Sequence, residues 1–284
     1  MNKIWMHAIA NIRKTKSAST TLVIMFVIAA LLFNSGLLVV VNYGSFFNNL
    51  KDELKPSSVY FAIPDKIYTD EVKTYIDENE HVEQTQTNEV VVLDANILSK
   101  GEDKSFPIMF SNMDEKREIS KWKFVGEHLS AEDMSVYVPD IFKAVSGYQL
   151  NDKITLNYTD VETKQVEAIT FTVKGYTEDI YFSSTDTGYL SFYLPEDSYK
   201  KVKDILNKPE YLAHVVFANL DNVKNASSIE SGIREILNLN SASLMGADPS
   251  TMLVVIDIEL IQLSRCMMAS MISAMMVVSL EPHL

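Results

Sequence analysis

The residues that could do chemistry are few and lie far apart in the sequence. The histidines are His7, His81, His128, His214 and His283. No two of them have the i, i+4 spacing with which a helix presents a pair of metal ligands. The single cysteine, Cys266, can form neither an internal disulfide nor a thiolate metal cage. Two Ser-x-x-Lys strings begin at Ser120 and Ser198, but neither is accompanied by the SDN or KTG sequence of serine hydrolases that use such a lysine. The sequence therefore predicts no enzymatic activity, no cofactor and no metal.

Ligand binding has weak support from residue types alone. Trp122, Phe124 and Tyr137 could line a ligand groove, although large aromatic side chains more commonly contribute to a core or to one face of a strand. Nucleic acid is a poor ligand for this chain. With 25 Lys and Arg against 38 Asp and Glu, the net charge is −13, and contact with phosphates needs clustered positive charge.

The first 50 residues differ from the rest in charge and in hydropathy. They contain four basic residues and no acidic one, so the remainder of the chain carries a net charge of −17. No charged side chain occurs between Lys16 and Lys51, and residues 20–41 within this gap are almost entirely apolar. A helix of about 20 such residues spans the hydrocarbon core of a bilayer. We therefore expect a transmembrane helix over residues 17–42.

Two other interpretations of this stretch are weaker. A signal peptide has a shorter apolar region followed by a cleavage site of small residues, and a helix in the core of a soluble protein is usually apolar on one side only. The basic residues Arg13, Lys14 and Lys16 precede the span, and the positive-inside rule places them in the cytoplasm. The acidic bulk of the chain is then expected outside the cell.

The segments that flank the span are also predicted to be helical. In residues 1–16, apolar residues such as Trp5 and Ile9 recur on one side, which suits a cytoplasmic helix lying in the membrane interface; an unstructured tail is the alternative. After the span, apolar residues keep a helical spacing as far as Leu54, and Pro56 predicts the end of the helix there.

From residue 57 onward the pattern changes to short strands and amphipathic helices. Strands are expected at 59–63, 82–98, 106–111, 135–138, 153–158, 166–175, 188–194, 214–218 and near 243–244. Helices are expected at 68–80, 195–206 and 222–237. Turn residues separate the strands of the middle section. The order β-α-β, then a β-rich insert, then β-α-β again predicts an α+β domain whose two ends pair around the insert.

The C-terminal residues predict a stalk and the start of a second span. Residues 252–265 are expected to form a helix, and residues 266–280 carry no charge but are too short to cross a bilayer. Ser270 and Ala274 are small residues four apart, a spacing that lets membrane helices approach closely. Asn34 lies in the middle of the first span, where its amide is expected to seek a partner on another helix or to bond to its own backbone.

Three stretches of the expected domain resemble motifs of the FtsX-like (MacB-like) permease subunits of ABC transporters. Residues 147–156, GYQLNDKITL, are similar to the family's G-x-x-x-G-D-x-I-x-L pattern, with Asn151 where glycine is usual. Residues 171–176, FTVKGY, resemble its F-x-V-x-G-hydrophobic strand, and residues 192–195, FYLP, resemble its strand-to-helix step. Together with the basic N-terminal helix and the two expected spans, the likeness covers nearly the whole chain.

The resemblance implies a subunit of the bacterial cell membrane that is not itself an enzyme. Its extracellular domain, residues 43–251, would have porter-like halves at 57–98 and 209–250 around a β-rich insert at 99–195. The resemblance also implies a separate cytoplasmic ABC ATPase, and packing against other permease helices or a second permease copy. ATP hydrolysis would move the outer domain for export or envelope signalling. Family members continue into further spans, so this sequence is expected to be a truncated product or a fragment. The alternative is a membrane-anchored extracellular sensor or binding module that needs no ATPase.

Overall fold

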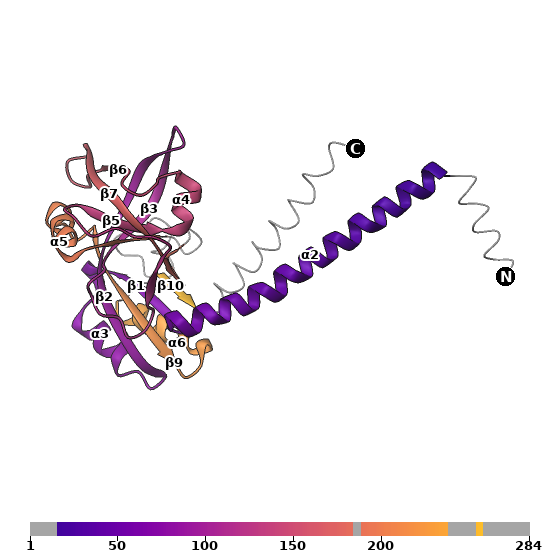
Figure 1. The fold of residues 1–284 in the computed structure, drawn as a ribbon. Coiled ribbons are helices and arrows are strands. Elements are labelled where there is room, and N and C mark those ends of the chain that lie inside the picture. The colour runs from indigo at the N-terminus through magenta and orange to yellow at the C-terminus, as the bar shows by residue number, and fades with distance from the viewer. Residues whose placement is uncertain (1–15, 184–188, 238–253, 258–284) are drawn as a thin grey trace. The chain divides into compact units, whose positions relative to one another are not determined.

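The computed structural model describes residues 16–183, 189–237 and 254–257 (Figure 1). These residues fall into two units, residues 16–48 and the described part of residues 49–262. Several expectations lie outside the described residues: the interfacial helix before Lys16, the strand near 243–244, the span after residue 266, and the residues Arg13, Lys14, Ser270 and Ala274.

The first described element is one continuous helix, α2 (Lys16–Leu54), which confirms the prediction of a helix that runs past the apolar stretch. Within it, Thr20–Leu38 has a mean hydropathy of 2.3, and none of this window is buried. Among the described residues it is the one helix whose length and composition would let it cross a membrane. The helix ends where Lys55 adopts a left-handed φ of 46°, and the proline that follows cannot continue it.

The described strands of residues 49–262 form one ten-stranded mixed sheet. They are β1 (Val59–Pro64), β2 (Val82–Ser99), β3 (Glu102–Asn112), β4 (Trp122–Val125), β5 (Ser135–Pro139), β6 (Lys153–Thr159), β7 (Val166–Asp179), β8 (Leu190–Leu194), β9 (Leu212–Leu220) and β10 (Val254–Asp257). Their order is β10-β1-β9-β2-β3-β8-β5-β7-β4, and β6 pairs with β2 and β7. Only β3 with β8 and β5 with β7 run parallel among these pairs.

Two helices cover one face of the sheet at β1 and β9. They are α3 (Asp70–Asp77) and α6 (Ala226–Ile236), which lie beside these strands in Figure 1. The side chain of Thr69 accepts a hydrogen bond from the Val72 amide and caps α3. Ile76 of α3 and Ile233 of α6 are buried together with Phe61 of β1 in one hydrophobic cluster.

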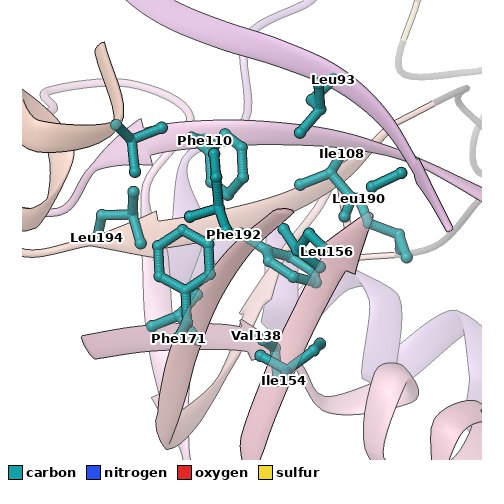
Figure 2. Close-up of a cluster of buried hydrophobic side chains, with 14 of the residues drawn as sticks. Leu93, Ile108, Phe110, Val138, Ile154, Leu156, Phe171, Leu190, Phe192 and Leu194 are labelled. Atoms are coloured by element: carbon teal, nitrogen blue, oxygen red, sulfur yellow. The ribbon is translucent and has the colours of Figure 1, made fainter. Parts of the chain in front are cut away.

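A second, larger hydrophobic cluster lies among the strands that follow (Figure 2). Phe110 of β3 contacts both Phe171 of β7 and Phe192 of β8, with ring centroids 5.5 and 6.2 Å away. The helices α4 (Asp140–Ser146) and α5 (Glu196–Ile205) add Phe142 and Val202 to this cluster. Burial of such large side chains contributes about 1.5–3 kcal/mol each to folding.

Strand β2 belongs to both clusters. Its first half pairs with β9 from Val82 to Val91, and its second half pairs with β3 from Val91 to Ser99. Alternate residues of the second half, such as Leu93 and Ile97, point into the larger cluster because side chains alternate along a strand. The two clusters are therefore joined by one uninterrupted strand.

The motifs that carry the family resemblance have structural reasons in this chain. Gly147 ends α4 with a φ of 89°, and Asn151 has a φ of 67°, a conformation that asparagine tolerates better than most residues other than glycine. A Cβ on Gly175 would lie 2.8 Å from both His128 Cβ and Tyr137 Cδ1. Pro195 stands just before α5, where a fixed φ suits the start of a helix.

Most of the expected strands and helices that fall on described residues are confirmed to within a few residues, one is wrong, and two further elements were not expected. Residues 254–257 form strand β10 against β1, so the expectation of a helix from residue 252 is wrong there; the β-branched residues Val254, Val255 and Ile256 suit a strand. The sequence did not predict β4 or α4, which have 4 and 7 residues and are too short for a periodic pattern to stand out.

Candidate functional site: a buried polar network at the end of helix α2

The first and the last described strands of the sheet, β1 and β10, are adjacent. Helix α2 ends at Leu54, and β1 begins at Val59. Val59 lies opposite Asp257, the last residue of β10, in an antiparallel pair. The backbone that follows α2 is therefore next to the end of the last described strand.

The last turn of α2 is fixed to the segment before β4. Leu50 and Leu54 are buried, and the backbone amides of Ser120 and Lys121 donate to the carbonyls of Lys55 and Leu54 at 2.7 and 2.8 Å. Carbonyls at a helix C-terminus have no partner within the helix, so these two bonds satisfy groups that would otherwise be unpaired. A salt bridge from Lys123 to Glu53 adds to this attachment.

A cluster of hydroxyl groups continues the contact into the interior. The Ser57 amide donates to Ser120 Oγ at 3.0 Å, and Ser120 Oγ donates to Ser57 Oγ at 3.0 Å. The Tyr181 hydroxyl donates to the Ser57 carbonyl at 2.6 Å. All three side chains are buried, and buried polar groups that have partners hold their neighbours in one arrangement.

Arg117 connects these hydroxyl groups to β8, a strand of the larger hydrophobic cluster. Its Nη1 donates to the Tyr193 hydroxyl at 3.3 Å, and its guanidinium carbon lies 5.4 Å from the Tyr193 ring centroid and 5.7 Å from that of Phe217. These distances suit cation–π attraction. The Arg117 side chain is buried, and its Nε has no hydrogen-bond partner among the described residues.

The network ends at a buried carboxylate. Tyr193 donates to Asp179 Oδ2 at 3.0 Å, and the Phe182 amide donates to Asp179 Oδ1. Burial, followed by the charge of Asp179, raises the pKa of the Tyr193 hydroxyl far above its ordinary value, so the hydroxyl keeps the proton that it donates. Polar contacts thus run from the end of α2 through Ser120 and Arg117 to β8 and β7.

The sequence did not point to this network because its members are far apart in the chain. Ser57 and Ser120 are separated by 63 residues, and Arg117 and Tyr193 by 76. Arg117 is one of many charged residues in the sequence, so its residue type alone did not indicate that it is buried. The network contains no nucleophile beside a base, and the described residues contain no group of three or more His, Cys, Asp or Glu that could hold a metal. Its hydrogen bonds connect the end of α2 to β8 and β7.

The residues that the sequence singled out lie elsewhere. Asn34 Nδ2 donates to the Ala30 carbonyl of its own helix at 2.8 Å, and the side chain is exposed. The sequence left two interpretations of Asn34 open, and this bond to its own backbone is one of them. A contact with another helix stays a prediction. Lys16 is the first residue of α2.

The three aromatic residues that could have lined a groove contact other rings. Trp122 stacks on Tyr193 with a centroid distance of 4.6 Å, and Phe124 stacks on His128 at 3.9 Å. Phe124 also contacts Tyr137 edge to face at 5.2 Å. Trp122 and Phe124 are half-buried and Tyr137 is buried, so these rings pack on the faces of their strands.

Comparison with known proteins gives likenesses to solved structures but no match of sequence. No model of a known protein family matches the sequence, and no curated protein matches it. A crystal structure of the extracellular domain of a noncanonic ABC-type transporter, YknZ, from Gram-positive bacteria is similar over 71% of this chain and 100% of that chain, at 13% identity and a TM-score of 0.33. A superposition this loose does not carry the fold or the function of that protein to this chain.

Proposed function

We propose that this chain is a permease-type subunit of an ABC transporter in a bacterial cell membrane, with its N-terminus in the cytoplasm and its sheet domain outside. In this proposal the chain is not an enzyme. A separate cytoplasmic ABC ATPase hydrolyses ATP, and α2 transmits the resulting movement to the domain for export or envelope signalling. Other permease helices, or a second copy of the chain, pack around α2. The motif resemblance and the apolar stretch of α2 support the assignment.

The observation that carries the proposal is the pairing of Val59 with Asp257 beside the end of α2. If membrane helices move this domain, the segment before the sheet and the segment after it must act on the same part of the sheet. Here β1 follows α2 after four residues, Lys55 to Ser58, and β10 is its hydrogen-bonded neighbour. A displacement of α2 would reach β1 directly and the larger core through Ser120 and Arg117.

Co-purification tests the partnership. The full gene product, extracted from its native membranes in a mild detergent, should retain an ABC ATPase that mass spectrometry identifies. Loss of the ATPase under conditions that keep the chain folded would contradict the transporter proposal and favour the anchored sensor.

A second experiment tests transmission through the buried network. A fluorescent label on the exposed face of β3, at Asp103→Cys with Cys266→Ser, should report an ATP-dependent change in the purified complex. The double variant Ser57→Ala, Ser120→Ala should reduce this change while ATP hydrolysis continues. Ser227→Ala, on the exposed side of α6, is the matched control and should leave the signal intact. An unchanged signal in the double variant would rule out this route.

The sensor alternative is favoured by one observation, a cavity on the sheet that could accept a ligand. A sensor would respond to a ligand without an ATPase, so the co-purification experiment distinguishes the two functions.

A further inference from the structure

The sheet at β1 and β9 is apolar on both faces. The sequences of the two strands, VYFAIP and LAHVVFANL, are nearly continuous apolar runs, a pattern typical of strands that are covered on both sides. Helices α3 and α6 cover the face that carries Phe61 and Val216. The opposite face carries Ala62 and Val215, which are register partners, and neither helix reaches it because side chains alternate between faces.

This opposite face forms the floor of a cavity of about 420 Å³. Four neighbouring strands contribute to the floor. Its residues are Ala62, Pro64, Ala213, Val215, Val90, Val92 and Met109. Phe182, Tyr211 and Val161 form walls. A volume of this size lies within the range of roughly 300–1,000 Å³ that is typical of small-molecule sites. A mainly apolar lining with a few polar groups is also typical of such sites.

The charged groups at the cavity are acidic. Asp94 and Glu210 line it, and no lysine, arginine or histidine is among the described lining residues. Glu210 is neutralised by Lys66, whose Nζ lies 2.6 Å from Glu210 Oε1. Asp94 is exposed, and no hydrogen bond or ion pair to it is found within the described part of the chain. It therefore provides a negative charge at the rim that is available to a ligand.

The position of Asp94 links this charge to the apolar floor. On β2 it shares a face with Val90 and Val92, since residues two apart on a strand point the same way. Tyr189 also lines the cavity. Burial, and then the charge of Asp94, raises the pKa of the Tyr189 hydroxyl, which agrees with a carboxylate close to that ring.

We propose that this cavity binds a small amphipathic cation, with its apolar body on the strand floor and its ammonium or guanidinium group at Asp94. The floor excludes water from apolar groups of the ligand, and the carboxylate adds a charge-assisted hydrogen bond. A neutral analogue would lose that bond, and an anion would be repelled. The site does not depend on ATP coupling, so it would serve either a transporter domain or a sensor.

Calorimetric titration of the full chain in lipid nanodiscs tests the site. The probes are 4-phenylbutylamine, 4-phenylbutanol and 4-phenylbutyrate, which share an apolar body and differ in charge; empty nanodiscs correct for partition into lipid. The amine should bind saturably and about tenfold more tightly than the alcohol, as expected for one hydrogen bond to a charged group, and the carboxylate should bind most weakly. Equal binding of all three, or no saturable binding, would overturn the proposal.

Variants locate the binding within the cavity. Asp94→Asn should lower the affinity for the amine to that for the alcohol and leave the alcohol unchanged. Asp103→Asn, an exposed position on β3 that does not line the cavity, makes the same charge change and should have no effect. Val92→Phe places a larger side chain in the cavity from a half-buried position and should weaken binding of the amine and the alcohol alike. An amine affinity that survives both Asp94→Asn and Val92→Phe would place the binding elsewhere.

These results are independent of the co-purification experiment. A chain that binds the amine but retains no ATPase would leave this site in place and remove the transporter function. A chain that retains the ATPase but binds no probe would overturn the binding site and leave the transporter function in place.

Discussion

The hydroxyl of Tyr193 donates to Asp179 Oδ2 at 3.0 Å in a part of the interior where both residues are almost inaccessible, with exposed fractions of 0% and 4%. This bond is the last contact of the polar network that begins at the end of α2. A buried carboxylate that loses its donor retains the cost of leaving water without the compensating bond, so the pair is sensitive to small changes.

Tyr193→Phe should therefore destabilise the domain by about 1–3 kcal/mol, the range for leaving a buried polar group unpaired. Urea unfolding of the purified chain, followed by circular dichroism, measures the change. Tyr148→Phe is the matched control. Its hydroxyl bonds to the Leu98 carbonyl from a half-buried position, and its removal should cost less than about 1 kcal/mol. Equal effects of the two substitutions would show that the network adds nothing to an ordinary surface hydrogen bond.

Gly175→Ala should also destabilise the domain, by about 1–3 kcal/mol, because overpacking shifts neighbouring side chains or backbone. The added methyl would lie 2.8 Å from a ring carbon of Tyr137 and from the Cβ of His128. The unfolding midpoint in urea measures the effect. Gly36→Ala, at a position where a Cβ meets no other atom within 4 Å, should leave that midpoint unchanged. An unchanged unfolding midpoint for Gly175→Ala would mean that Tyr137 and His128 can shift at no cost in free energy.

Asp160 should contribute to stability in a pH-dependent way. Hydrogen bonds from Lys208, and then from the Thr163 amide, hold the pKa of Asp160 well below its usual value. In the unfolded chain this group takes up a proton near pH 4, whereas the folded chain resists protonation. The stabilisation is therefore complete above about pH 4 and is lost as the pH falls further.

Asp160→Asn should lower the stability at pH 7, and the difference from the unmodified chain should narrow as the pH is lowered from about 4 to 2. Urea unfolding at several pH values measures both curves. The control is Asp103→Asn at an exposed position. A difference that stays constant with pH would contradict the assignment of this effect to the Asp160 carboxylate.

Asn34→Leu tests the prediction that the amide in α2 binds another helix. Leucine keeps the helix apolar and removes the polar group, which is worth about 0.6 kcal/mol on average between membrane helices. The dissociation constant for the partner should rise by about threefold, which lowers the amount of partner protein that co-purifies. Ser35→Ala, at the adjacent exposed position, should leave this amount unchanged. A variant that assembles as the original does would leave the bond to Ala30 as the sole role of Asn34.

The sequence predicted elements well where a local pattern was strong. Strand β6, KITLNYT, alternates apolar and polar residues, and its buried positions alternate in the same way. Pro195 marked the start of α5. Helix α2 followed from a long stretch without charge, because hydropathy over such a length does not depend on distant contacts.

Elements that depend on distant contacts were beyond the sequence. The β-branched residues of β10 suit a strand, but they lie in an apolar run that also fits a helix. The strand that pairs with β10 and decides between the two, β1, is almost 200 residues away in the chain. The same holds for the candidate sites. Arg117 and Asp94 carry charges like many others in this chain, and only the tertiary structure shows that one is buried and the other lies at the rim of a cavity.

The length of β2 has a consequence for how the domain folds and how it can be divided. Its 18 residues extend for at most roughly 60 Å at about 3.3 Å per residue, and they form hydrogen bonds with β9 at one end and β3 at the other. Removing residues 99–195 would leave the second half of β2 as an apolar ribbon with free backbone groups, which favours aggregation. The two clusters should accordingly melt in one cooperative transition, and neither should be obtainable as a soluble fragment without the other.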